Sequence, residues 1–177
     1  ASRETDRLPV SFVLMYMRPL LEQIRSWDCV ERAEFAGSVR RRKETIGDVD
    51  ILVATSEPER VHKKFCKLGE VDVTGEQKSR IRVSVPGSLI QIDLLTVDPD
   101  RMGPALNYFT GSLEHNVLLR KLAQKKGLKV NEHGIWRGKK RVDHNDEHDL
   151  YRLLDLPYVV PELREGNSIP KTGGLLK

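Results

Sequence analysis

The sequence predicts an α+β fold in which a mixed β-sheet with helices is followed by a smaller helical lobe. A pattern of apolar residues at helical spacing opens the chain, and a series of short β-prone segments follows it. Pro86-Gly87 marks a turn that joins two of these segments into a hairpin. After Pro99 the β-prone segments give way to consecutive helical patterns, so we place the boundary between the two parts near residue 100.

The first elements are expected from spacing and residue type. Apolar residues recur at helical spacing from Phe12 to Ile24, and Ser11 is positioned to cap that helix. Val30–Phe35 is a strand candidate, and Asp48–Ala54 is strongly β-prone with at least one buried face. Glu57–Leu68 is expected to form the next helix because proline stands in its first turn.

The remaining strands of the sheet and the first helices of the lobe follow in order. Val71–Thr74, Ile81–Val85 and Leu89–Val97 are expected to be strands. Met102–Phe109 and Leu113–Lys126 are expected to be helices, the second of which ends where a glycine follows.

The end of the chain has weaker signals. Lys129–Val130 and Gly134–Arg137 are expected to form a small hairpin. Asn145 or Asp146 is expected to cap a last helix that runs through residue 154. From Pro157 onward, recurring proline and glycine favour an extended or disordered chain.

Composition excludes two broad classes of protein. No apolar run approaches the roughly 20 residues that a membrane span needs, so no membrane partner is expected. Cys29 and Cys66 belong to no CxxC pair and cannot make a disulfide framework. Reduced, partly buried thiols in a cytoplasmic protein are therefore expected.

Charge is unevenly distributed along the chain. Residues 112–141 contain nine Lys or Arg against two Glu, a net charge of +7, whereas residues 142–165 contain seven acids and two bases. A basic segment of this kind is the electrostatic pattern expected for contact with a phosphate backbone. A solvated helix face would explain the same charges.

Three aspartates are candidate metal ligands. Asp48 and Asp50 are two apart on a strand, so their side chains point the same way and their charges repel. Mg²⁺ prefers carboxylate oxygens and would remove that repulsion. Asp93 lies among apolar residues of another strand and would join the pair if the two strands are neighbours. Three such carboxylates can hold two cations roughly 3.5–4 Å apart, although a DxD pair alone is also common at solvated strand ends.

A glycine–serine turn precedes these acids. Gly37 would let the backbone approach a ligand closely, and Gly47 stands directly before Asp48. Ser38, nearby backbone N–H groups and an arginine could hold phosphate oxygens, although a plain turn has the same sequence. The possible anion site and the metal-holding carboxylates are close in sequence. This arrangement is what binding of a Mg²⁺–triphosphate requires.

These motifs resemble those of DNA polymerase family X. GSVRRRKETIGDVDILV (residues 37–53) resembles the nucleotidyltransferase signature, and QIDL (residues 91–94) is similar to the strand with the family's third aspartate. YFTGS (residues 108–112) resembles a family segment that is followed, as here, by an asparagine and an arginine. GLKVNEHG, LPY and PELREG resemble later family segments, so the resemblance runs from residue 7 to about 166.

The resemblance implies a fold, an activity and partners. Residues 1–100 would be a polymerase beta-like nucleotidyltransferase palm, residues 101–166 a helical fingers/thumb lobe that closes on the nascent base pair, and residues 167–177 a flexible tail. The chain would add dNTPs to a primer 3′-OH on primer–template or gapped DNA, in repair or gap filling, as a monomer. Either an excised catalytic core or a minimal enzyme is expected, since the family's lyase and phosphoesterase domains find no room in the chain.

The resemblance also implies roles for single residues. Asp48 and Asp50 would bridge two Mg²⁺ ions, for which Mn²⁺ is expected to substitute, and Asp93 would bind the ion that activates the 3′-OH and could accept its proton. The triphosphate would be contacted by five residues: Arg7, Gly37, Ser38, Arg41 and Gly47.

Further implied roles fall on the second part of the chain. Tyr108 and Phe109 would flank the sugar, and Gly111 would permit the bend there. Asn116 would reach the base or the minor groove from the nucleotide side. Arg120 would contact the template strand, and the DNA-binding set would also include Lys121, Lys125 and Lys126.

Two departures from the family pattern leave the chemistry intact. Leu113 stands where polymerase beta has an aspartate that stacks on the incoming base, and Gln91 stands where polymerase beta has an arginine.

Two other functions stay open. One is a template-independent enzyme, or one acting on RNA or a small molecule, within the same superfamily. The other is a non-catalytic module that binds DNA ends.

Overall fold

The computed structural model describes residues 6–166 and residue 169. The tail expected at residues 167–177 therefore lies outside the described residues, apart from Ile169. The chain divides into two compact units, Ala1–Pro99 and Asp100–Lys177. Each unit has its own buried apolar cluster.

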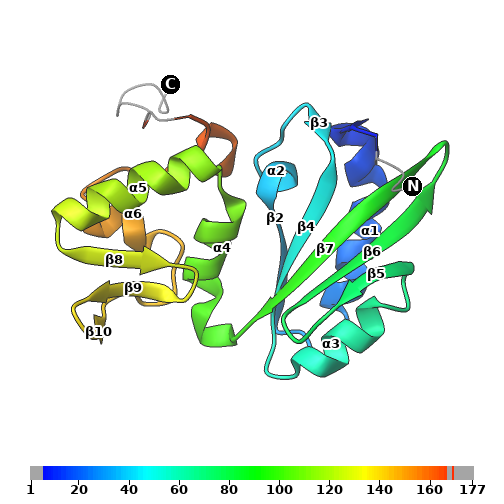
Figure 1. Ribbon diagram of the computed structural model, residues 1–177, viewed down its shortest axis with the longest axis horizontal. Coiled ribbons are helices and arrows are strands. Elements are labelled where there is room, and N and C mark those ends of the chain that lie inside the picture. The colour runs from blue at the N-terminus through cyan, green and yellow to red at the C-terminus, as the bar shows by residue number, and fades with distance from the viewer. Residues whose placement is uncertain (1–5, 167–168, 170–177) are drawn as a thin grey trace. The chain divides into compact units, whose positions relative to one another are not determined.

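The first unit is built on a five-stranded mixed sheet, which confirms the expected fold class (Figure 1). Its central pair, β4 and β7, is parallel, and the other neighbours are antiparallel. A parallel pair needs a crossover connection, and here the chain passes through a helix and two strands before it returns. In sheet order the strands are β2 (Arg32–Ala36), β4 (Asp48–Ala54), β7 (Ser88–Val97), β6 (Lys78–Val85) and β5 (Glu70–Thr74).

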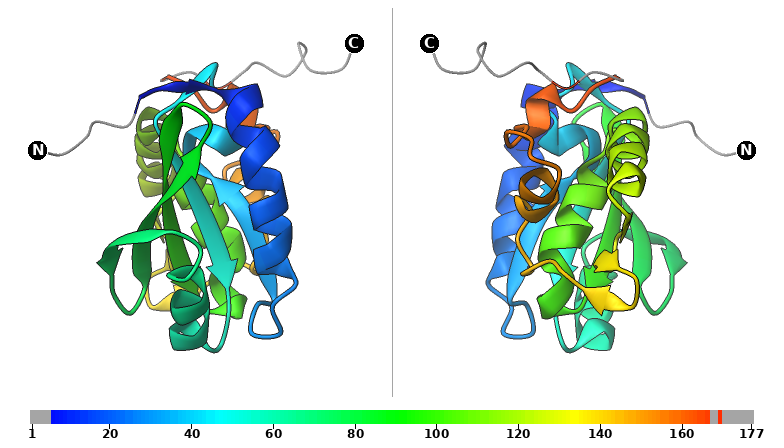
Figure 2. Two further views of the ribbon diagram at one scale, coloured as in Figure 1. Left: turned by 90° about the vertical axis from the view of Figure 1, so that its right-hand side faces the viewer. Right: turned by 90° about the vertical axis from the view of Figure 1, so that its left-hand side faces the viewer.

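Two helices, α1 (Val10–Arg25) and α3 (Pro58–Phe65), cover one face of this sheet (Figure 2). Alternate residues of the central strands pack beneath them: Val49, Ile51, Val53, Ile90, Ile92 and Leu94. Because strand side chains alternate between faces, Asp50 and Asp93 point to the opposite face. Burial of the apolar set thus fixes the side of the sheet on which the acids lie.

Three short elements of the first unit were not expected. Leu8–Pro9 (β1) pairs with Thr45–Ile46 (β3), and both strands are too short for a periodic pattern to reveal. Gly37–Arg40 (α2) is a single helical turn.

The expectation of a Ser11 cap is wrong: α1 begins at Val10, and its N-cap residue is Pro9, whose side chain accepts no hydrogen bond.

The second unit combines helices with a three-stranded antiparallel sheet of order β10-β9-β8. Leu119 and Ala123 of α5, with Leu150 and Tyr151 of α6, contribute to its buried cluster. In chain order the elements are η1 (Pro99–Arg101), α4 (Met102–Thr110), α5 (Leu113–Lys125), β8 (Leu128–Asn131), β9 (Gly134–Arg137), β10 (Lys140–Arg141), α6 (Asp149–Leu153) and η2 (Pro161–Leu163).

The expected cap of the last helix is wrong, because α6 begins only at Asp149 after His148. The Asn145 side chain instead accepts a hydrogen bond from the Gly103 N–H at 2.9 Å, and Asp146 accepts one from the His148 N–H at 2.8 Å. The Asn145 side chain therefore ties this loop to the second residue of α4, and the Asp146 side chain stabilises the loop that precedes α6.

The expectation of an extended or disordered chain from Pro157 is wrong for Pro161–Leu163, while Val160 before it is extended. Val159 is buried in the apolar cluster of the second unit, and Pro161–Leu163 forms a turn of 3₁₀ helix. Arg164 is fully buried, donates to the Val159 carbonyl at 2.9 Å and lies 2.7 Å from Glu147. Proline and glycine here shape a packed segment, because a buried arginine and apolar residues anchor it.

Across residues 6–166, none of the helices has the length and apolar character needed to cross a membrane.

Candidate active site

The parallel pairing of β4 with β7 brings two of the candidate acids together. Asp50 and Asp93 are direct partners in that ladder, and Asp48 lies opposite Gln91. Asp93 is buried, Asp50 is half-buried and Asp48 is exposed. The strand neighbourhood on which the three-acid prediction depended is thereby confirmed, while its metal-binding role stays a prediction.

The electrostatics of Asp50 reflect this crowding. Its pKa is raised to about 6, first because burial disfavours the charged form and then because the carboxylates of Asp93 and Asp48 repel it. Lys78 and Arg41 oppose the shift. A cation that binds next to Asp50 would therefore stabilise the ionised form of its carboxyl group.

Gly37 lies against Asp50. A Cβ atom at Gly37 would stand 2.2 Å from the Asp50 Oδ2, and the residue has a φ of +57°, in the left-handed region. Glycine is required twice over, by the backbone conformation and by the close approach of a carboxylate. The glycine–serine motif therefore borders the acids in space as well as in sequence.

The expected triphosphate residues occupy defined places in the first unit. The Arg7 guanidinium donates to Oγ1 and the carbonyl of Thr45 at 2.9 and 2.8 Å, and its Nη1 would stand 3.3 Å from a Cβ at Gly47. Ser38 lies within α2, and Arg41 follows that helix as its C-cap residue. Arg7 and Gly47 are thus neighbours, although 40 positions separate them.

Two basic residues on β6 contact the third aspartate, and sequence reasoning missed both. Arg80 donates from Nε to the Asp93 Oδ1 at 2.7 Å and from Nη2 to Oδ2 at 3.2 Å. The Lys78 Nζ lies 3.5 Å from the same Oδ2. Lys78, Arg80 and Arg82 alternate along one strand face, and that pattern could have predicted a basic row beside an acidic one.

The donor set fits a divalent cation in its chemistry. Three carboxylates on adjacent strand positions are hard oxygen ligands, and the raised pKa of Asp50 marks a place where negative charge lacks compensation. Among residues 6–166, however, no three His, Cys, Asp or Glu side chains are close enough together to hold a metal ion as they stand. Both oxygens of Asp93 already accept hydrogen bonds from the Arg80 guanidinium.

The second unit holds the YFTGS motif at the junction of α4 and α5. Tyr108 and Phe109 meet edge to face with ring centroids 5.1 Å apart. Gly111 has a φ of +71° and ends α4, and its peptide bond to Ser112 is cis. The Ser112 hydroxyl accepts the His115 N–H at the start of α5, so the motif joins the two helices through a capped turn.

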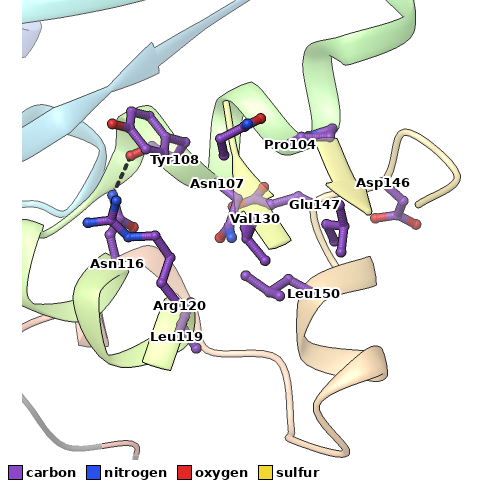
Figure 3. A pocket seen from close by; sticks show the side chains of 12 residues that line it. Pro104, Asn107, Tyr108, Asn116, Leu119, Arg120, Val130, Asp146, Glu147 and Leu150 are labelled. Atoms are coloured by element: carbon purple, nitrogen blue, oxygen red, sulfur yellow. Dashed lines mark hydrogen bonds between the residues drawn. The ribbon is translucent and has the colours of Figure 1, made fainter. Parts of the chain in front are cut away.

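Asn116 and Arg120, one turn apart on α5, line a pocket together with Tyr108 (Figure 3). The Asn116 Nδ2 donates to the Tyr108 carbonyl at 2.7 Å, which holds α5 against the end of α4. These three sequence-predicted residues therefore form one surface of the second unit.

The expected DNA-binding lysines lie further along α5. Lys121 and Lys125 are exposed and four residues apart, so they share one helix face. Lys126 caps the end of the helix and contacts Asp155. All three are exposed to solvent.

A buried hydrogen-bonded chain behind the motif was not predicted. The His115 Nε2 lies 2.9 Å from the Tyr151 hydroxyl, which lies 3.3 Å from the Asn107 Oδ1. Burial, with the nearby charge of Arg164, lowers the pKa of His115 to about 4. His115 is fully buried and therefore packs the interior of the unit.

Comparisons with known proteins point the same way as these motifs. Residues 105–165 match the family model of the DNA polymerase beta thumb. Over 97% of its length the chain is 26% identical to the DNA polymerase/3'-5' exonuclease PolX of Bacillus subtilis (strain 168), of which 31% is covered.

Two further relatives come from distant sources. The chain is 26% identical over 136 residues to Repair DNA polymerase X of African swine fever virus (isolate Pig/Kenya/KEN-50/1950), with 72% of this chain and 78% of the viral protein covered. It is 29% identical over 160 residues to DNA polymerase lambda of Rattus norvegicus, with 73% of this chain and 28% of the rat protein covered. The chain thus spans less than a third of the bacterial and rat relatives and most of the viral one.

Proposed function

We propose that this chain, which belongs to DNA polymerase family X, is a DNA-directed DNA polymerase that adds dNTPs to a primer 3′-OH in repair or gap filling. The observation that carries the proposal is the direct pairing of Asp50 with Asp93 beside Gly37. That arrangement puts oxygen ligands for divalent cations next to a glycine turn suited to phosphate, which is what phosphoryl transfer requires.

In this proposal Asp48, Asp50 and Asp93 hold two Mg²⁺ ions, for which Mn²⁺ can substitute. Bound divalent cations supply charge stabilisation at the attacking and leaving oxygens of phosphoryl transfer. Asp93, the most buried of the three, lies on the central strand of the sheet, where we propose that it could accept the proton of the primer 3′-OH. Asp50 and Asp48 offer their oxygens from the neighbouring strand.

The remaining residues of the first unit would bind the triphosphate of the incoming dNTP. Gly37 and Ser38 present backbone N–H groups and a hydroxyl, and Arg7, Arg41 and Gly47 complete the set. The bonds from Arg7 to Thr45 support this role, because they pre-orient a guanidinium next to Gly47. Arginine suits phosphate because its planar fork can donate two parallel hydrogen bonds.

The second unit would contact the sugar, the base and the DNA strands. Tyr108 and Phe109 would flank the sugar, with Gly111 permitting the turn between helices. Asn116 and Arg120 would face the nascent pair, and Lys121, Lys125 and Lys126 would neutralise backbone phosphates. The exposure of these lysines supports a nucleic-acid substrate over a small molecule.

We also propose palm and fingers/thumb roles for residues 1–100 and 101–166, a flexible tail at residues 167–177, and a monomer in solution. The two free cysteines among the described residues support a cytoplasmic location. Light scattering would test the monomer directly.

Primer extension on three substrates tests the function: a template–primer, a one-nucleotide gap and a bare single strand, each at low salt with Mg²⁺ or Mn²⁺. The proposal expects template-directed incorporation on the first two. Incorporation on the single strand alone would support a template-independent enzyme instead. Absence of Mg²⁺-dependent dNTP binding by calorimetry would support a non-catalytic module that binds DNA ends.

A further inference from the structure

Three charged side chains form a row across the centre of the sheet in the first unit. Asp50 of β4 is the direct partner of Asp93 on β7, and Asp93 is in turn the direct partner of Arg80 on β6. Direct partners in a sheet point to the same face. Arg80 therefore lies on the far side of Asp93 from Asp50, on the face where the candidate metal ligands gather.

The contact between Arg80 and Asp93 is a two-point fork. Nε donates to Oδ1 at 2.7 Å and Nη2 donates to Oδ2 at 3.2 Å. The Asp93 side chain is 6% exposed and that of Arg80 is 31% exposed. Forked, charge-assisted pairs with a buried carboxylate are among the stronger polar contacts in proteins, so this pair fixes the orientation of the Asp93 carboxylate.

The same pair competes with a cation. Both oxygens that a metal would use at Asp93 already accept hydrogen bonds, and a guanidinium repels a divalent ion at close range. The hydrogen bonds with Asp93 raise the pKa of the Arg80 guanidinium, against the effect of burial, and the charges of Asp93, Asp48 and Asp72 add to the rise. The positive charge of Arg80 thus partly neutralises the site aspartates, which is the role that a bound divalent cation would otherwise have.

We propose that Arg80 is a positioning residue which holds Asp93 in the metal-free protein, is displaced from it when a divalent cation binds, and so raises the cation concentration that the site requires. This inference rests on the proposed function, since it concerns the same site. It predicts that neutralising Arg80 tightens metal binding in the absence of DNA.

A matched control exists on the same strand. Arg82 is two residues from Arg80, points to the same face and makes its own forked pair with Asp72 of β5. Arg82 does not contact Asp93, and its partner strand is at the edge of the sheet. Loss of Arg82 therefore removes the same charge from the same strand but leaves the Asp93 oxygens occupied.

The test is Mn²⁺ binding by the DNA-free protein, followed by the electron paramagnetic resonance signal of free Mn²⁺. Arg80→Gln is expected to lower the Mn²⁺ Kd by about threefold to tenfold, as loss of a competing charged hydrogen-bond partner implies. Arg82→Gln is expected to stay within about twofold of the unsubstituted protein because its effect is only long-range and screened. Equal Kd values for the two variants would overturn the inference.

A second Arg80 variant and the unsubstituted protein show whether a negative result concerns folding, the proposed function or this inference alone. Arg80→Met keeps the apolar stem of the side chain, so it provides a second neutral variant if circular dichroism shows that Arg80→Gln does not fold. Absence of Mn²⁺ binding by the unsubstituted protein would overturn the proposed function together with this inference. Normal binding that no Arg80 variant tightens would overturn this inference alone and leave the function standing.

Discussion

Asp50 and Asp93 are direct partners across the parallel ladder of β4 and β7, which places two carboxylates side by side on one face of the sheet. The two aspartates are 43 positions apart in the chain, and their buried neighbours on each strand, such as Ile51 and Ile92, point to the other face. Their proximity is thus a property of the sheet register, and a one-residue slip would separate them.

Replacement of Asp93 tests the chemistry most directly. Asp93→Asn is expected to lower kcat for primer extension by about 10³-fold or more, because a ligand of the reacting centre and its proton acceptor are lost. Binding of dNTP, measured by calorimetry with Mg²⁺, is expected to change by less than about threefold because the triphosphate contacts lie elsewhere. Asp98→Asn, in the exposed loop after the same strand, is the matched control, and near-normal extension by Asp93→Ala would refute the assignment.

A neutral residue in place of Asp50 is expected to stabilise the metal-free protein. Because burial and two neighbouring carboxylates raise its pKa to about 6, the ionised side chain is unfavourable at pH 7.5. Asp50→Asn is expected to raise the free energy of unfolding by about 1–2 kcal/mol in EDTA while abolishing activity. Urea unfolding measures this change. Asp48→Asn, at an exposed position, should change stability less, and a destabilised Asp50→Asn would contradict the argument.

Gly37 and Gly87 separate backbone strain from a clash at the site. Both have a positive φ, +57° and +77°, but a Cβ at Gly37 would meet Asp50 at 2.2 Å whereas one at Gly87 would meet nothing within 4 Å. Each alanine variant is expected to lose about 1 kcal/mol of stability from strain. Gly37→Ala alone is expected to lose extension activity and Mg²⁺–dNTP affinity. Equal activity of the two variants in steady-state assays would show that Gly37 does not border the site.

His115 predicts a pH dependence of stability in the acid range. Its pKa is lowered from 6.5 to about 4 in the folded state, so the unfolded chain binds more protons between these values. The contribution of His115 to stability therefore rises with pH through this window, and it is lost as pH falls from 6.5 towards 4, whereas the raised pKa of Asp50 contributes the opposite slope. The expected loss is roughly 2–3 kcal/mol.

His115→Phe is expected to flatten that dependence because phenylalanine cannot gain the proton. Urea unfolding at several pH values between 4.5 and 7.5 would measure the slope for each variant. His133→Gln, at an exposed position on the same unit, should leave the slope unchanged. If the free energy of unfolding of His115→Phe kept the same slope against pH, other titrating groups would be responsible for that slope.

Part of this protein was predictable from its sequence for physical reasons. The alternation of DVDILVA and QIDLL required each strand to bury one face, and the acids then had to lie on the other. Periodicity and residue type carry this information because they act over many residues at once.

The rest depended on contacts that no local pattern contains. The pairing of Arg80 with Asp93 requires the β6–β7 register, which sequence alone left open. The packed segment from Pro157 to Gly166 was expected to be extended or disordered because the burial of Arg164 depends on Glu147 and Tyr151, which precede the segment, as well as on Tyr158 within it. Asn145 and Asp146 are good capping residues, yet the Asn145 side chain bonds the N–H of Gly103 at the start of α4, and that of Asp146 bonds a loop N–H before α6.

The lysines of α5 make a prediction about DNA affinity that concerns salt. Lys121 and Lys125 are exposed on one helix face, and each phosphate contact contributes about 0.9 to the slope of log K against log salt. The double variant Lys121→Gln with Lys125→Gln is therefore expected to lower that slope by about 2 for duplex DNA, as fluorescence anisotropy from 50 to 200 mM salt would measure. Lys63→Gln with Lys67→Gln, also exposed but around α3 in the first unit, is the charge-matched control. If both double variants shift the slope equally, the α5 face makes no specific phosphate contacts and only net charge matters.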